Sequence, residues 1–487
     1  MAQPQVSSPT NPQARSSLVQ MPVEILIRIT YHLPTPDLEN VRLICKEIES
    51  KLFHHFSSEF FQKKQFMVST ASLQALIDIS KHPALGQALK HVIIATDRPS
   101  TSFFSSGRID DPAEEAAKRR NLQVAQGDAR NLMCGGLCRD MLAEAFASLP
   151  NLQVVDLRDF NSPSRSRDGK GVPWRSYGSV DLARNTATPV TTQAHNVDDE
   201  YASSLFMNIM GALSIANARP RNIEVLLRNR NWSLFDWAFA IPPRLEQSFA
   251  SVLSGLKTLH LSLSMRQDPL AIRKFISYAN NVTWLRINFN YVRPEESDGL
   301  FSWLALKQGE DDPNYANTPF QVKGVSFDAV ERFDIGNADM WPDTLLNVIK
   351  KLAPTLRIIS LRRLSLKEKT RDPLAKINPW VPFLHSLIQV PDIKLRVFDF
   401  SQLQHITRDD WRGQVFFEDK SNPERNKVRD YKVDTRLAPL QTVVYKIRDL
   451  MAPDWPYVPP PVNNDDDDDD EDLESDDDDE EMDDGDA

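Results

Sequence analysis

The stretch LKTLHL, Leu256 to Leu261, decides the fold. Its leucines follow the pattern L-x-x-L-x-L, in which the last three residues alternate as they do in a strand with one apolar face. The preceding segment, LEQSFASVLSG, spaces its apolar residues as a helix does and ends on Gly255. A helix, a short turn and a strand are therefore expected to form one structural unit.

This unit recurs along the chain. Hexads of the same form are LQVVDL at Leu152, IEVLLR at Ile223, LKTLHL at Leu256, VTWLRI at Val282, VKGVSF at Val322, LRIISL at Leu356 and LRVFDF at Leu395. One helix cannot bury its apolar face on one strand, so consecutive units are expected to stack. The prediction is an α/β leucine-rich-repeat-like solenoid over residues 131–451, with a parallel sheet on its inner side.

Two features leave the repeat imperfect. IEVLLR places Arg228 at an apolar position, so this strand can also run in the other frame, and VKGVSF has no helical segment close before it. An ordinary α/β domain with irregular strands therefore stays open as the alternative.

Composition divides the rest of the chain into segments. Residues 1–17 are polar and proline-rich and are expected to be disordered, whereas residues 18–66 have helical spacing. Residues 67–97 are interpreted as a helical linker to the solenoid. Two polar stretches, 98–130 and 161–198, are expected to be a flexible insertion before the solenoid and a disordered insertion within it.

Charge is unevenly distributed. The 487 residues carry a formal net charge of −11, but 14 Asp and 4 Glu lie between Asp465 and Asp486, where there is no Lys or Arg. Without these 18 side chains, 57 basic residues face 50 acidic ones, so a mildly basic body is expected to carry a disordered acidic tail, residues 452–487. Such a tail serves solubility, or binds basic proteins or the protein's own basic body. Ser475, which precedes four aspartates, is a candidate phosphorylation site.

The sequence offers little for chemistry. Its three cysteines, Cys45, Cys134 and Cys138, cannot build a disulfide framework in a chain of this length, and Cys134 and Cys138 lack a second ligand pair for zinc. No phosphate-binding, dinucleotide-binding, metalloprotease or nucleophile-elbow motif is present. We expect no catalytic residues, metal, cofactor, membrane span or nucleic-acid partner, and a cytoplasmic or nuclear location.

The N-terminal stretch MPVEILIRITYHLPTPDLENVRLICK, Met21 to Lys46, contains two proline-led apolar segments. Pro22 and Pro36 suit a first helical position, and Thr35 can cap the second helix. The stretch resembles an F-box, whose pattern begins with L-P-x-E and ends with a basic residue, a spaced aliphatic residue, Cys and a basic residue. Met21 replaces the usual Leu, and Ile48 stands where many F-boxes carry Trp.

The resemblance implies docking to a Skp-family adaptor and, through it, to the cullin core of a ubiquitin ligase. It implies that Met21, Pro22, Ile25, Leu38 and Cys45 contact the adaptor, while Leu26, Ile29 and Val41 serve internal packing. An F-box followed by degenerate leucine-rich repeats, here of fungal type, is a common arrangement. The alternative is that all these apolar residues pack on the solenoid that follows.

The function implied is that of a non-catalytic substrate-recognition subunit, with an unknown protein target on the solenoid. Side chains between the inward positions of each hexad are expected to face solvent on the concave sheet. The substrate-binding candidates are Arg158, His260, Trp284, Arg286 and Arg362, because exposed Trp and Arg are frequent binding anchors and Arg pairs with acidic or phosphorylated segments. A one-residue slip in frame would reverse the set. A scaffold that holds basic partners without a ligase is the alternative function.

Overall fold

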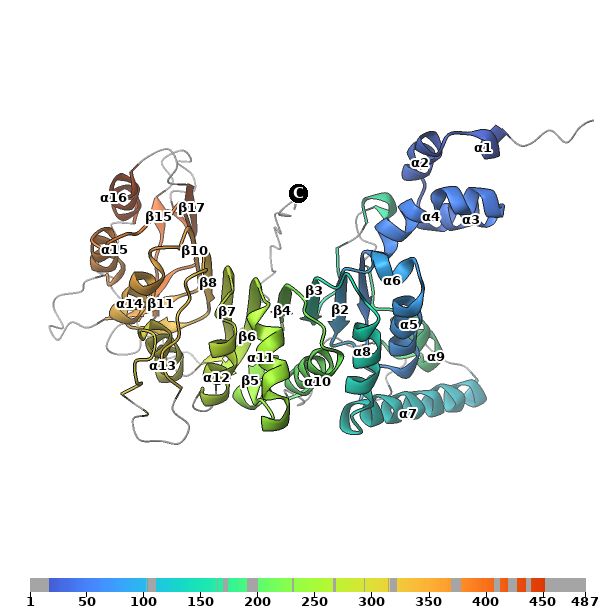
Figure 1. Ribbon diagram of the computed structural model, residues 1–487, viewed down its shortest axis with the longest axis horizontal. Coiled ribbons are helices and arrows are strands. Elements are labelled where there is room, and N and C mark those ends of the chain that lie inside the picture. The colour runs from blue at the N-terminus through green and yellow to red at the C-terminus, as the bar shows by residue number, and fades with distance from the viewer. Residues whose placement is uncertain are drawn as a thin grey trace, which may run out of the picture.

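The computed structural model describes residues 17–101, 103, 111–163, 165–169, 174–190, 200–229, 232–265, 269–292, 294–313, 315, 322–368, 378–406, 412–418, 427–434 and 439–451. The sequence predictions on residues 1–16, on Ser475 and on the acidic tail 452–487 lie outside these ranges. A small helical unit lies at one end of the long axis, and units of strand and helix follow it in chain order to the other end (Figure 1).

The N-terminal unit consists of α1 (Ser17–Gln20), α2 (Val23–Tyr31), α3 (Thr35–Leu43) and α4 (Lys46–Phe61). Pro22 and Pro34 precede α2 and α3, and Pro36 occupies the first turn of α3, where its missing N–H leaves no hydrogen bond unmade. Leu26, Ile48 and Leu52 form a core cluster separate from that of the solenoid. The unit thus has a small core of its own.

The main sheet holds nine parallel strands in chain order within the described residues. They are β1 (Lys63–Phe66), β2 (His91–Ala95), β3 (Val154–Arg158), β4 (Asn222–Leu226), β6 (Thr258–Met265), β7 (Trp284–Val292), β8 (Arg332–Gly336), β10 (Ile358–Arg362) and β12 (Val397–Ser401). Antiparallel β17 (Asp430–Asp434) covers β12 at the far edge, and short β5 (Leu234–Phe235) pairs with β6. Covering a sheet edge protects it from pairing with other chains.

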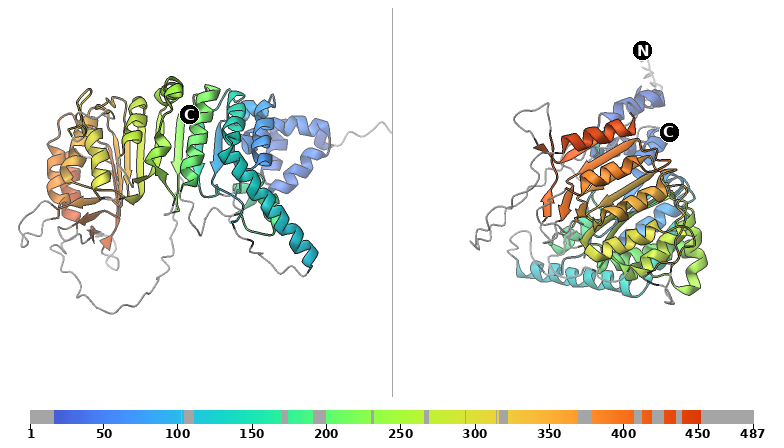
Figure 2. Two further views of the ribbon diagram at one scale, coloured as in Figure 1. Left: turned by 90° about the horizontal axis from the view of Figure 1, so that it is seen from below. Right: turned by 90° about the vertical axis from the view of Figure 1, so that its left-hand side faces the viewer.

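Helices pack on one face of this sheet (Figure 2). They are α5 (Thr70–Lys81), α6 (Leu85–Ala88), α8 (Leu137–Ala147), α10 (Tyr201–Ala216), α11 (Glu246–Ser254), α12 (Leu270–Tyr278), α13 (Pro294–Ala305), α14 (Pro342–Leu352), α15 (Trp380–Ile388) and α16 (Leu440–Leu450). Helix α7 (Pro112–Cys134) packs on α8 and α9 (Ser179–Thr186). A second sheet contains β9 (Asp339–Met340), β11 (Ser365–Lys367), β13 (Gln404–Ile406) and β14 (Arg412–Gln414), and β15 (Phe417–Glu418) pairs with β16 (Lys427–Val428). The fold is mixed α/β with a parallel sheet, which is compatible with a leucine-rich-repeat-like solenoid.

The hexads explain why these strands form. In the LKTLHL unit Leu256, Leu259 and Leu261 are at most 1% exposed, and the strand begins at the third hexad residue, Thr258. The hexads at Leu152, Val282, Leu356 and Leu395 have the same frame, with each strand beginning at the third residue. Positions one, four and six therefore face the helices, and positions three and five face away from them.

Two predicted strands need correction. VKGVSF at Val322 is not a strand; the strand of this unit is β8, whose hexad starts eight residues later at Val330 (VERFDI). The hexad of the unit that contains IEVLLR starts three residues earlier than predicted, at Pro220. Ile223 and Val225 are buried and occupy positions four and six of that hexad. In both units, the observed frame is the one that places apolar residues on the face of the sheet that packs against the helices.

The solenoid also begins earlier than predicted. Residues 67–97 are not a linker, because LKHVII at Leu89 is a hexad that forms β2. Within the predicted 18–66 unit, residues 63–66 already form β1 and pair in parallel with β2. The β1 hexad, FQKKQF, does not stand out in the sequence because Lys64 occupies its fourth position. Lys64 is half-buried, and this burial lowers its pKa to about 8.

The two expected insertions contain regular structure. Helix α7 occupies residues 112–134, most of the predicted flexible segment 98–130; Asp111 caps it through the Ala113 N–H. Only Leu122 and Leu132 on this helix are buried, which explains why apolar periodicity did not reveal it. Within 161–198, the described residues include η1 (Ser166–Asp168) and α9.

Candidate functional site

From β3 to β17, strand register aligns one polar side chain per strand across the face of the sheet opposite the helices, whereas the aligned residue on β2 is Ile93. We call this set the polar row: Asp156, Glu224, His260, Arg286, Asp334, Ser360, Asp399 and Lys432. Each member occupies the fifth position of its hexad, except Lys432 on the antiparallel edge strand. Neighbouring strands lie about 4.8 Å apart, so adjacent members are close enough to pair.

The centre of the polar row is a network around Asp334. Arg286 donates to Asp334 Oδ2 from Nε and Nη2 at 3.1 and 3.0 Å, and Arg332 Nε donates to Oδ1 at 3.0 Å. The indole N–H of Trp284 also donates to Oδ2, at 2.9 Å. The Arg332 guanidinium lies 3.9 Å from the Trp284 ring centroid, a cation–π contact. Trp284 is thus held in one orientation on a part-exposed surface.

Nearer the N-terminal end, the row is buried and charged. Asp156 is fully buried and pairs with Arg158, and His91 Nε2 lies 3.3 Å from Asp156 Oδ2. Burial opposes ionisation of Asp156, but the hydrogen bond with His91 and the charge of Arg158 outweigh it and lower its pKa. Burial lowers the pKa of His91, although Asp156 opposes this change. These groups form a compensated internal cluster.

Glu224 and His260 lie between the two networks, with His260 Nδ1 4.0 Å from Glu224 Oε2. Burial, and then repulsion from Asp156, raise the pKa of Glu224 to about 7. Burial, together with Arg286 and Arg332, lowers the pKa of His260 well below its usual value. His260 packs edge-on against Trp284, with ring centroids 4.4 Å apart. At this point of the polar row, Glu224 is therefore the group that gains or loses a proton near neutral pH.

The five predicted substrate-binding residues lie on this one face but differ in access. Arg158 and His260 are 5% and 3% exposed, so the prediction that they face solvent was wrong; Arg158 pairs with Asp156, and His260 is covered beside Trp284. Trp284 and Arg286 are half-buried, and Arg362 is exposed. The accessible part of the face is therefore its centre and C-terminal half.

Sequence reasoning missed the residues that organise the face. Asp334 and Arg332 lie in the hexad at Val330, which was placed eight residues too early, and Glu224 lies in the hexad assigned the wrong frame. The pattern V-x-x-F-x-I at Val330 was the signal that would have found the first two.

A second candidate surface lies on the N-terminal unit, where α2 and α3 pack on α4. Large apolar side chains of this unit are exposed: Val23 36%, Ile25 41%, Ile29 42%, Tyr31 58%, Leu43 78% and Ile44 60%. The prediction that Ile29 is internal was therefore wrong, whereas Leu26 is fully buried and Val41 is part-buried against the small core.

The five residues predicted to contact an adaptor lie at different depths of this unit. Ile25 and Pro22 are exposed, and Met21 and Cys45 are half-buried against the core of the unit. Leu38 is only 1% exposed, so it is not on the surface of this chain as folded here.

The segment 165–169 fastens this unit to the solenoid. Arg167 forms a bidentate ion pair with Glu59 of α4 and donates from Nη1 to the carbonyl oxygens of Thr30 and Leu33, at 3.0 and 2.8 Å. Asp168 accepts from the N–H and hydroxyl of Thr35 at the start of α3, both at 2.8 Å. We call this segment the strap. It belongs to the stretch that was expected to be disordered.

Other chemistry is sparse in the residues that the structure describes. They contain no cluster of three or more His, Cys, Asp or Glu able to hold a metal ion, and none of their helices is long and apolar enough to cross a membrane. Cys45 is half-buried, Cys134 is exposed, and Cys138 is buried, which raises its pKa to about 12.

Comparisons with known proteins add little to this picture. No protein-family model matches the sequence, and no curated protein matches it significantly. Among solved structures, the chain is similar to a leucine-rich repeat-containing protein of Legionella pneumophila, with 13% identity and a TM-score of 0.23, over 80% of this chain and 98% of that one.

Proposed function

We propose that this protein is the substrate-recognition subunit of a Skp–cullin–F-box ubiquitin ligase, in which the N-terminal unit binds the adaptor and the solenoid binds the target. The observation that carries the proposal is the exposed apolar surface of the N-terminal unit, on a segment whose sequence resembles an F-box. Six large apolar side chains are exposed there, whereas three are fully buried in its core cluster. Exposed apolar patches of this kind mark protein–protein contacts.

The apolar surface consists of side chains that the described part of the chain leaves exposed. Fully burying one such side chain contributes about 1.5–3 kcal/mol, so covering even part of the set supports a stable complex. Leu43 and Ile44 are the most exposed members, and Ile25 is both exposed and one of the residues that the F-box resemblance assigns to the adaptor. Leu38, by contrast, supports the unit from within.

The solenoid supplies a surface suited to a protein target. Trp284, held by Asp334 and flanked by Arg286 and Arg332, is a preorganised aromatic and cationic anchor. Arg362 adds an exposed cation two strands away. This composition favours a target segment with an apolar or aromatic residue next to acidic ones.

The test is co-expression of the full chain with a Skp-family adaptor and measurement of the complex by affinity capture. We expect a stoichiometric complex for the wild type and its loss in the double variant Ile25→Asp plus Leu43→Asp. Val124→Asp is the matched control, because Val124 is also apolar and 72% exposed but lies on α7. Absence of a complex with the wild-type chain would overturn the proposal.

The same variants separate this proposal from the scaffold alternative. A scaffold would retain its cellular partners in the double variant, and those partners would not be ubiquitinated more slowly. Under the ligase proposal, target binding is retained but ubiquitination of the target is lost. Leu38→Ala is less informative, since removing a buried side chain also loosens the unit itself.

A further inference from the structure

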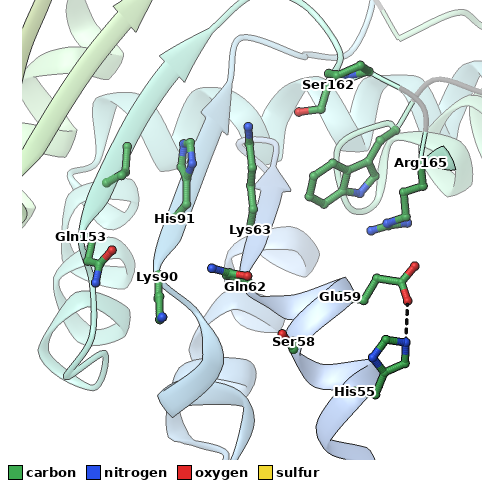
Figure 3. Close-up of a pocket in the computed structure, with 13 residues that line it drawn as sticks. His55, Ser58, Glu59, Gln62, Lys63, Lys90, His91, Gln153, Ser162 and Arg165 are labelled. Carbon is green, nitrogen blue, oxygen red and sulfur yellow. Dashed lines mark ion pairs between the residues drawn. The ribbon is translucent and has the colours of Figure 1, made fainter. Parts of the chain in front are cut away.

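A cavity of about 700 Å³ lies where α4, the first strands of the sheet and the strap region meet (Figure 3). Lys63 and His91 enter it from β1 and β2, where they are paired in register, and Lys90 precedes β2. Arg165 and Trp174 line it from the other side. None of the functions considered so far uses this cavity.

The lining carries more positive than negative charge. Lys63, Lys90 and Arg165 supply three cationic side chains from three different segments. The one carboxylate in the lining, Glu59, is already held in a bidentate ion pair by Arg167. His91 faces the buried Asp156 and, with its pKa lowered by burial, does not add a full charge near neutral pH.

Arg165 is positioned as an incompletely satisfied donor. Its guanidinium lies between two aromatic rings, 4.3 Å from the Phe60 centroid and 4.6 Å from the Trp174 centroid. Its Nη2 is buried and makes no hydrogen bond within the described part of the chain. Burial lowers the pKa of Arg165 although Asp168 and Glu59 oppose this change. The rings fix the plane of the guanidinium but accept no strong hydrogen bond from it.

We propose that this cavity is a binding site for a phosphate monoester, in which Arg165 donates to the oxyanion and Lys63 and Lys90 supply positive charge from the rest of the lining. A planar guanidinium binds two oxygens of a phosphate at once, and ammonium groups complete the neutralisation of a dianion. The open side of the cavity accommodates the organic part of the ester. Because α4 and the sheet share the cavity walls, a bound phosphate also connects the N-terminal unit to the solenoid.

Two sources can supply this chemistry, a phosphorylated side chain of a polypeptide and a small phosphate. Oxyanion binding itself is independent of the ligase proposal, whereas a phosphorylated target as its source rests on that proposal. Adaptor capture separates the failure of the phosphate site from the failure of the ligase proposal. Lys90→Gln is expected to leave adaptor capture unchanged, so loss of phosphate binding and loss of adaptor binding are separate results.

The test uses the full chain and inorganic phosphate at constant ionic strength, with binding followed by ³¹P line broadening and by the thermal unfolding midpoint. We expect saturable binding to the wild type and at least a tenfold weaker affinity in Lys90→Gln and in Arg165→Gln. Lys257→Gln is the matched control, since Lys257 has the same place in its hexad as Lys90, the residue after the first leucine. The control is expected to bind as the wild type does.

Equal phosphate affinity in Lys90→Gln, Arg165→Gln and Lys257→Gln would overturn the site. Arg165 packs between two rings, so Arg165→Gln can fail to fold. Lys90 makes no side-chain hydrogen bond among the described residues, so Lys90→Gln then tests the site by itself. A second arm compares a pool of phosphoserine peptides with inorganic phosphate. Tighter binding of the peptides supports a polypeptide source, and equal binding rules that source out.

Discussion

Arg286 on β7 and Asp334 on β8 are register partners and are joined by two hydrogen bonds, at 3.1 and 3.0 Å, to one carboxylate oxygen. The pair is the point at which the polar row changes from a buried, compensated interior to an accessible surface. Arg286 is 35% exposed at its side chain, while Asp334 is 6% exposed. Asp334 therefore acts as the buried acceptor that orients the groups above it.

Replacing Asp334 with Ala is expected to lower the free energy of unfolding by roughly 3 kcal/mol, because it leaves Arg286, Arg332 and the Trp284 N–H without their acceptor. Urea unfolding measures this change. Ser360→Ala, at the next strand of the same row, is the matched control and is expected to change stability by less than about 1 kcal/mol. Equal losses in the two variants would contradict the central role of Asp334.

Glu224 gives a dependence of stability on pH. Burial, and then Asp156, raise its pKa from 4.5 to about 7, so the folded chain holds this proton more tightly than the unfolded chain. Its contribution is complete below about pH 4.5 and is lost as the pH rises to about 7. Relative to the wild type, Glu224→Gln is expected to gain up to about 3 kcal/mol across this window and to stay level above it. Unfolding curves between pH 4 and 8 measure the difference, and Glu144→Gln, at an exposed glutamate on α8, is the control.

Lys64 predicts the opposite trend in a different window. Burial, and then Arg165, lower its pKa from 10.5 to about 8, so the unfolded chain binds this proton more tightly. The cost to stability is complete below about pH 8 and disappears as the pH rises to 10.5. Lys64→Met is expected to stabilise the protein at pH 7 by about 1–3 kcal/mol and to lose most of that gain at pH 10. Lys81→Met, at an exposed lysine, serves as the control in guanidinium unfolding; a pH-independent gain would refute this explanation.

The strap makes a prediction about local opening. Arg167→Ala removes the partner of Glu59 and the donor to two helix carbonyls, and is expected to weaken attachment of the N-terminal unit by roughly 3 kcal/mol. Hydrogen exchange is expected to rise in α2 and α3 but not in β6 and β7, since the two cores are separate. Arg184→Ala removes an exposed surface pair and is the control. Uniform loss of protection throughout the chain would show that the strap is not a local device.

The repeat was predicted at five units in which apolar side chains occupy positions one, four and six, although LKHVII at Leu89, which has the same pattern, was assigned to the linker. It was lost at β1, where Lys64 replaces the fourth, and at β4, where Pro220 occupies the first. At β8 a neighbouring apolar run at Val322 imitated the hexad and drew the prediction away from Val330. Periodicity reports apolar spacing, so any unit whose buried positions are not apolar escapes it.

The candidate site was less accessible to sequence reasoning than the fold. Alternation assigns Arg158 and His260 to the correct face of the sheet, but their burial depends on groups distant in sequence, such as Ser162 beside Arg158 and Trp284 beside His260. The strap was hidden for the same reason: Arg167 and Asp168 lie in a polar segment, and their partners precede them by more than 100 residues. Long-range ion pairs leave no local pattern.

The even register of the polar row sets a length scale for whatever lies across it. Two strand spacings cover about 9.6 Å, and one turn of a polyproline II helix, three residues, covers about 9.3 Å. A segment in this conformation that crosses the strands at right angles therefore presents the same side to the sheet at every third residue and every second strand. From Arg286 the next strands in phase are β10 and, beyond β12, β17, so such a chain would present every third side chain to the line Arg286, Ser360 and Lys432.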